Sequence, residues 1–144
     1  MFLLDTNVLS ELRRRQRTHR KVAAWADGVH AGDLFLSAIT ILEIEAGTLL
    51  LARRDAAQAA VLRAWIDDQV LPAFEGRILS VDTAVAQRCA RLHVPDPRAE
   101  RDALIAATAL VHRLCVVTRN VADFEPMGVE LLDPWRGFRK DSRS

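Results

Sequence analysis

Short apolar runs alternate along this chain with longer stretches in which apolar residues recur at helical spacing. The short runs have the character of buried strands and centre on residues 2–4, 34–36, 77–81, 115–118 and 129–132. Helical patterns cover about residues 6–12, 22–27, 37–51, 55–72, 83–92 and 98–112. Strands that alternate with helices in this way predict an α/β fold, with a mostly parallel sheet covered on both faces.

Single residues mark several helix boundaries. Ser37 or Thr40 begins the long helix after the second strand, and Asp55 caps the next helix. Pro95 breaks the chain before the last long helix. That helix is almost wholly apolar over residues 103–111, which indicates that it is buried.

Two acids follow predicted strands. Asp5 comes directly after the first run, and Asp123 follows the fourth. In open α/β sheets the carboxyl ends of the strands are where ligands bind. Thr118 and Asn120, near Asp123, could hydrogen-bond a metal-bound water. The simpler alternatives are that Asp5 caps the following helix and that Asn120 and Asp123 shape a turn.

Two further acids lie on predicted helices. Helical spacing puts Glu43 on an apolar face, where a carboxylate is costly unless it is paired or bound to metal. Thr40 and Glu43 also have the spacing of a capping box, and periodicity does not separate Glu43 from Glu45. Asp102 opens the apolar helix, where the helix dipole favours a negative charge, or it pairs with Arg98.

Four converging carboxylates would repel one another, and a hard divalent cation such as Mg²⁺ or Mn²⁺ resolves the conflict. Such a site can activate water and stabilise charge on a phosphodiester. Zinc is not favoured, because the cysteines and histidines lack ligand spacing. These residues are Cys89, Cys115, His19, His30, His93 and His112.

With these motifs in view, the sequence resembles the PIN-domain family, specifically the VapC-like toxin ribonucleases of bacterial toxin–antitoxin pairs. The resemblance covers nearly the whole chain and rests on several blocks in order. They are residues 4–11, residues 37–44 with Gly47, residues 102–109, residues 117–124 and residues 132–135.

The resemblance implies a three-layer α/β/α sandwich whose mostly parallel five-stranded sheet has the order 3-2-1-4-5. It also implies RNA cleavage that depends on Mg²⁺ or Mn²⁺, with Asp5 and Asp102 as direct metal ligands. Glu43 would act through water or help to activate it, and Asp123 would complete the catalytic, metal-binding quartet. Polar supporting positions would be Thr6, Asn7, Thr118 and Asn120.

The family further implies a homodimer and a cognate VapB-like antitoxin, joined in a larger complex. The antitoxin's C-terminal segment would wrap the toxin and block the acidic pocket. We expect a PIN domain over residues 1–135 and a basic, flexible tail over residues 136–144. The cysteine usage, and the lack of a signal peptide or membrane-length apolar stretch, predict a cytoplasmic protein with no membrane contact.

Composition adds little, since the 144 residues carry a net charge of only +1 with 50% hydrophobic and 27% charged residues. Basic side chains crowd residues 13–21 and the C-terminus, where they either touch phosphate or form a solvated face. Two alternatives remain: a catalytically inactive binding module with this fold, and a haloacid-dehalogenase-like phosphatase. The phosphatase pattern has a second aspartate where this chain has Asn7.

Overall fold

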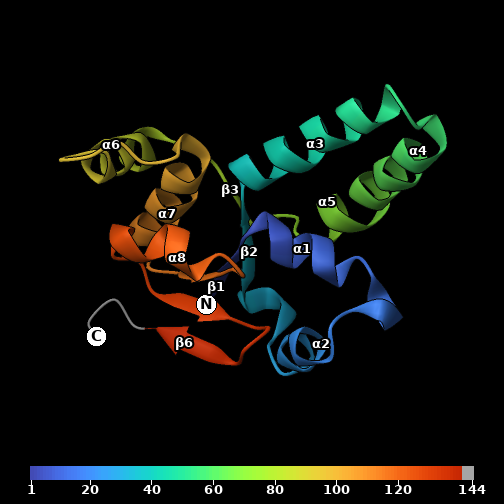
Figure 1. Cartoon of the computed structure of the whole chain (residues 1–144), viewed down its shortest axis with the longest axis horizontal. Coiled ribbons are helices and arrows are strands. Elements are labelled where there is room, and N and C mark those ends of the chain that lie inside the picture. The colour runs from blue at the N-terminus through green and yellow to red at the C-terminus, as the bar shows by residue number, and fades with distance from the viewer. Residues whose placement is uncertain (141–144) are drawn as a thin grey trace.

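A computed structural model describes residues 1–140, which fold around one twisted sheet (Figure 1). The sheet has the order β3-β2-β1-β4-β5-β6, and every pairing from β3 to β5 is parallel. The predicted order 3-2-1-4-5 is therefore confirmed. The strands are β1 (Phe2–Leu4), β2 (Leu34–Ser37), β3 (Ile78–Leu79), β4 (Cys115–Val117), β5 (Leu131–Asp133) and β6 (Phe138–Lys140).

The sequence pattern does not predict β6, which pairs antiparallel with β5. It lies inside the segment 136–144 that was expected to be a tail; residues 141–144 are outside the described part of the chain. Gly137, at φ +66°, adopts the left-handed backbone that reverses the chain between the two strands. A short strand attached through backbone hydrogen bonds needs no apolar alternation, so the pattern gave no signal for it.

Helices cover both faces of the sheet, and α3 and α4 project from it as a hairpin (Figure 1). Ser37 caps α3 and Asp55 caps α4 through side-chain oxygens that accept backbone N–H bonds, at 3.0 and 3.1 Å. The helices are α1 (Thr6–Leu12), α2 (Arg20–Asp27), α3 (Ala38–Ala52), α4 (Ala56–Trp65), α5 (Leu71–Ala73), α6 (Thr83–Leu92), α7 (Glu100–His112) and α8 (Val121–Phe124). Shorter helical turns are η1 (Arg15–Arg17), η2 (Ala31–Asp33), η4 (Glu125–Met127) and the π-turn η3 (Ile66–Val70).

Successive strand residues point to opposite faces, so the core has two halves. Leu3 and Val116 pack with α6, α7 and α8, whereas Leu4 and Val117 pack with α1 and α3. Helix α7 is buried along most of its length, as its apolar sequence predicts. Among the described residues no helix has the length and apolar character needed to cross a membrane. The two halves hold β1 rigidly in the centre of the sheet, where it delivers Asp5 to the carboxyl edge.

Candidate functional site

Asp5 is fixed at the centre of the site. Its backbone N–H donates to the Val117 carbonyl at 2.9 Å, which continues the β1–β4 pairing. Its Oδ1 accepts from the Thr6 backbone N–H at 2.8 Å, so Asp5 also caps α1. Its Oδ2 accepts from Thr118 Oγ1 at 2.8 Å and from Asn7 Nδ2 at 3.2 Å. The Asp5 carboxylate thus both caps α1 and belongs to the acidic site.

The pKa of Asp5 is raised, chiefly because burial removes water from the carboxylate. Hydrogen bonds from Thr118, Thr6 and Asn7 lower the pKa, and the negative charge of Asp123 raises it. The hydrogen bonds orient the carboxylate but do not offset the cost of burying its charge. A cation at this position would do so.

The hydrogen bonds of Asn7 require an amide at this position and exclude a second carboxylate two residues after Asp5. Its Nδ2 donates to Asp5, and its Oδ1 accepts from the Arg119 backbone N–H at 3.2 Å. An aspartate could accept the second bond but could not donate the first. Asn120 belongs to the same group, because its backbone N–H donates to Thr118 Oγ1 at 3.0 Å. The amide therefore ties the carboxyl ends of β1 and β4 together, a use that the phosphatase alternative does not account for.

Glu43 reaches the site from α3. Its Oε1 accepts from Thr6 Oγ1 at 2.8 Å, and its Oε2 lies 3.9 Å from Arg101 Nη1. The capping-box alternative is wrong, because Ser37 is the cap and Thr40 is a buried residue within the helix.

Glu45, which periodicity could not separate from Glu43, points elsewhere. Its two carboxylate oxygens lie 2.6 and 2.8 Å from the guanidinium of Arg63 on α4. That bidentate pair holds the pKa of Glu45 below its usual range. Glu45 therefore ties α3 to α4, whereas Glu43 contacts Thr6 and acts electrostatically on Asp102.

Asp102 reaches the acidic site from the first turn of α7. Burial raises its pKa, and the negative charges of Asp5, Asp123 and Glu43 raise it further. In the described part of the chain Asp102 forms no ion pair with Arg98, so that alternative is not supported. Asp123 is exposed in the first turn of α8. Asp102 thus interacts electrostatically with the other three predicted acids, which brings all four to one edge of the sheet.

The donor set fits a hard divalent cation. It consists of carboxylate oxygens, which Mg²⁺ and Mn²⁺ prefer, with threonine and asparagine side chains around them. Among the described residues, the cationic side chain that forms an ion pair with one of the four acids is Arg101, which lies 3.9 Å from Glu43 and is more than half exposed. The chemistry of the cluster therefore leaves its negative charge for a metal ion to neutralise.

A second group of potential ligands lies apart from this site, at the contact of α6 with α7. Ligand atoms of Cys89, His93 and Glu100 lie within 4.8 Å of one another, an approach that the sequence pattern did not reveal. His93 Nδ1 accepts from the Arg98 backbone N–H at 3.0 Å, so the neutral ring carries its proton on Nε2. That nitrogen faces Cys89 Sγ and Glu100, at 3.7 and 3.5 Å. A metal would have to displace the proton, so we interpret the group as a hydrogen-bonded helix contact.

Comparison with known proteins agrees with the fold and the acidic site. The PIN domain family matches residues 2–126. Toxin FitB of Neisseria gonorrhoeae is 40% identical over 141 residues, which cover 94% of this chain and 99% of that protein. VapC ribonuclease Y4jK of Sinorhizobium fredii is 35% identical over 140 residues, covering 94% and 98%.

The crystal structure of FitAcB from Neisseria gonorrhoeae contains a chain with the same architecture. It superimposes with a TM-score of 0.84 at 38% identity and covers 94% of this chain and 99% of its own. The family match and the full-length similarity to these relatives lead to one conclusion: this chain belongs to the PIN domain family.

Proposed function

We propose that this protein is a metal-dependent endoribonuclease and the toxin of a VapBC-type toxin–antitoxin pair. The observation that carries the proposal is the meeting of Asp5, Glu43, Asp102 and Asp123 at the carboxyl edge of the sheet. Relatives named as VapC ribonucleases support the choice of RNA as the substrate.

Asp5 and Asp102 would hold the metal directly, because both are partly desolvated and both gain from a neutralising charge. Carboxylate donors suit Mg²⁺ and Mn²⁺ alike. A divalent ion at such a site lowers the pKa of water and offsets negative charge on a phosphodiester. In hydrolysis a water oxygen bonds to phosphorus, one P–O ester bond breaks, and the leaving oxygen gains a proton.

Glu43 would accept the proton that the water loses. Thr6 donates to its Oε1 at 2.8 Å, which restrains the carboxylate, and its Oε2 lies 3.9 Å from Arg101 Nη1. Asp123 is exposed and would complete the negative cluster from α8. Thr118 and Asn7 would act by holding Asp5 in one orientation.

The similarity to Toxin FitB supports an antitoxin partner, and one structure of the same fold is described as a toxin–antitoxin complex. We propose that the C-terminal segment of a VapB-like antitoxin covers the acidic pocket, and that the toxin forms a homodimer within the complex. Cys89 and Cys115 are both buried and are not joined in a disulfide, in keeping with a cytoplasmic location.

Cleavage of total RNA by the antitoxin-free protein tests the proposal. Asp5→Asn and Asp102→Asn each keep side-chain size but remove a charge from the cluster. We expect each to lower the cleavage rate at least about a hundredfold, equivalent to roughly 3 kcal/mol in barrier height. Excess EDTA should abolish cleavage, and either Mg²⁺ or Mn²⁺ should restore it.

The matched control is Asp27→Asn, at the exposed C-terminal end of α2, which should cleave RNA at the parent rate. Full activity of either site variant, or full activity in EDTA, would contradict the metal assignment. Tight RNA binding by the parent with no cleavage in either metal would instead identify a catalytically inactive module.

A further inference from the structure

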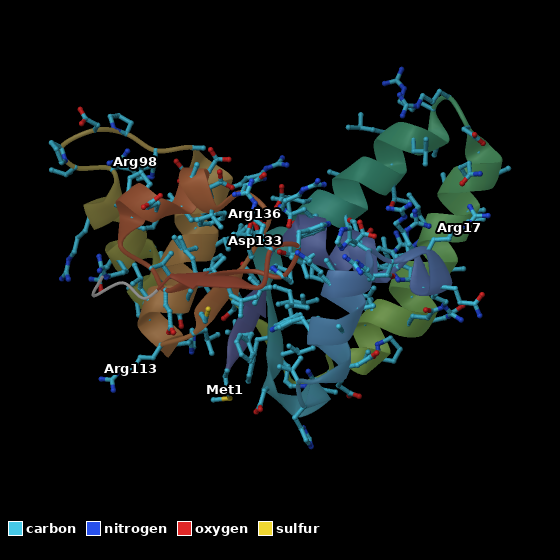
Figure 2. All side chains as sticks on the ribbon, turned by 60° about the horizontal axis from the view of Figure 1, so that its bottom comes forward. Met1, Arg17, Arg98, Arg113, Asp133 and Arg136 are labelled. Atoms are coloured by element: carbon cyan, nitrogen blue, oxygen red, sulfur yellow. The ribbon has the colours of Figure 1, made fainter. Side chains whose placement is uncertain are left out.

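A pocket of about 350 Å³ adjoins the acidic cluster, between α8 and the turn that joins β5 to β6. Asp123 lines it, so the pocket is continuous with the acidic cluster. Arg119, Asn120, Asp133 and Arg136 line the remainder. Figure 2 shows Asp133 and Arg136 side by side near the centre of the molecule, with Arg113 far from them. The volume is at the lower end of the range for small-ligand pockets.

Arg119 presents its planar, charged guanidinium at this pocket. Its backbone N–H is fixed by Asn7, and its guanidinium carbon lies 5.1 Å from the centre of the Trp135 ring. At this distance over the ring the guanidinium makes a cation–π contact with the indole. The side chain is exposed and forms no ion pair with a described carboxylate, so the other face and the charge are available.

Asp133 organises the rest of the pocket. It is 4% exposed, and its Oδ1 accepts from the Trp135 backbone N–H at 2.9 Å, which fixes the start of the turn. Its Oδ2 lies 4.0 Å from Arg136 Nε, and the Arg136 side chain is 82% exposed. At that distance and exposure the pair is weak, so Arg136 can turn to another anion.

We propose that these three residues, Arg119, Trp135 and Arg136, form a nucleotide subsite for the residue next to the scissile phosphate of a single-stranded RNA. The base stacks on the open face of Arg119, and Arg136 contacts the phosphate. Proteins read single-stranded RNA by stacking its bases on aromatic rings and on guanidinium planes. Because the four acids repel the RNA backbone, affinity must come from cationic groups beside them. The inference rests on the proposed function and names where its substrate is held.

Binding of short fluorescent oligonucleotides tests the subsite, with every variant built on the uncleaving Asp5→Asn protein. One probe is oligo(A) RNA, and the other is an abasic oligomer that has the backbone charge alone. We expect Arg119→Ala to weaken oligo(A) binding about tenfold, as loss of one base stack does. It should weaken binding of the abasic oligomer less. Arg119→Lys keeps the positive charge but lacks the planar guanidinium. Compared with Arg119→Ala, it should restore binding of the abasic oligomer but not of oligo(A).

Trp135→Leu keeps an apolar side chain against the core and removes the ring beneath Arg119; it should mimic Arg119→Ala. The charge control is Arg113→Asn, far from the pocket, since asparagine tolerates the φ of +57° found there. It should bind both probes like the parent. Equal melting temperatures would show that all variants are folded.

Full rescue of oligo(A) binding by Arg119→Lys would overturn base stacking, as would parent-like binding by Arg119→Ala. Weakened antitoxin binding with unchanged RNA binding would reassign the pocket to the protein partner and overturn the inference. The proposed hydrolysis is judged separately, from cleavage by the parent protein. If the parent cleaves no RNA while the probes behave as expected, hydrolysis fails and the nucleotide subsite stands.

Discussion

Thr118 shows how strongly one side chain supports the acidic cluster. It is fully buried, and its hydroxyl donates to Asp5 at 2.8 Å. Thr118→Val keeps the shape and removes the donor, so a buried carboxylate loses a hydrogen bond. We expect the free energy of unfolding to fall by about 1–3 kcal/mol, and RNA cleavage to fall with it. Urea denaturation and the cleavage rate measure the two effects.

Thr108→Val is the matched control, because Thr108 is also fully buried. Its hydroxyl donates to the Leu104 carbonyl at 2.8 Å, inside α7, where that carbonyl already accepts the helical hydrogen bond. No charged group loses a partner, so we expect a change within roughly 0.5 kcal/mol. A loss as large as that of Thr118→Val would show that valine is tolerated poorly at both sites and would contradict the role assigned to Thr118.

Asp102 gives a prediction with a defined pH dependence. Burial and the neighbouring acids raise its pKa in the folded metal-free protein above the ordinary value of 3.8. At neutral pH the charged form therefore destabilises the folded state, and protonation relieves this as the pH falls through the raised pKa. Asp102→Asn should thus raise the melting temperature at pH 7 in EDTA, with the gain vanishing toward about pH 4. A gain independent of pH would refute this account.

The choice between Glu43 and Glu45 marks the limit of sequence reasoning at this scale. Both lie on the same apolar helix, two positions apart, and the apolar pattern of the sequence alone accepts either. What separates them is Arg63, which lies on another helix and pairs with Glu45. Likewise, residue spacing made both the capping box and the Asp102–Arg98 ion pair plausible. In the structure Glu43 instead accepts a hydrogen bond from Thr6, and Asp102 is partly buried beside the other acids. Contacts with residues distant in the sequence determine the role of each of these side chains, and residue spacing cannot reveal such contacts.

A side chain at Gly47 of α3 would stabilise the helix but would reduce the space in the pocket beside it. It lies inside the helix, an added Cβ would meet no atom within 4 Å, and alanine is favoured there. Gly47→Ala should therefore raise the free energy of unfolding by about 0.5–1 kcal/mol. Gly47 also lines a pocket of about 310 Å³ with Thr6 and Glu43, so the added methyl should weaken antitoxin binding or slow cleavage. Thermal unfolding and a cleavage assay with and without antitoxin test both parts.

Gly128→Ala provides the opposite case, because Gly128 has φ +72° at the end of η4. Alanine is strained there, and we expect destabilisation by about 1 kcal/mol. If Gly47→Ala were destabilising as well, the free space around Gly47 would have to be reinterpreted.

The elements themselves were largely predictable, and the exceptions share a cause. Strands β1, β2 and β4 are apolar runs, and α7 is almost wholly apolar over residues 103–111, so their patterns are unambiguous. Helix α8 has only four residues, and β6 has three. Strands β1 and β4 are equally short but wholly apolar, whereas charged residues interrupt both α8 and β6, and the partners that stabilise these segments, such as β5 for β6, lie elsewhere in the fold.

At the scale of the whole molecule, the net charge of +1 hides a strong local field. The four acids come from the end of β1, from α3, from α7 and from the start of α8, and only the sheet topology unites them. Sequence patterns placed each acid on its element and favoured a common sheet edge for Asp5 and Asp123, but left a simpler alternative open for each acid. The resemblance to a known family then assigned all four to one site. The geometry now supplies its physical reason: the carboxyl end of β1 lies between those of β2 and β4, the strands that precede α3 and α8.

Mutual repulsion in the cluster predicts that divalent metal stabilises the folded chain. A ligand that binds only the folded state adds about 2.7 kcal/mol at a hundred times its dissociation constant. Magnesium should therefore raise the melting temperature of the EDTA-treated protein by several degrees. Sodium chloride of equal ionic strength should not, because screening acts weakly on partly buried charges. Asp5→Asn should lose the magnesium response, whereas Asp27→Asn, with its exposed side chain on α2, should keep it. An equal response in Asp5→Asn and the parent would place the ion elsewhere on the molecule.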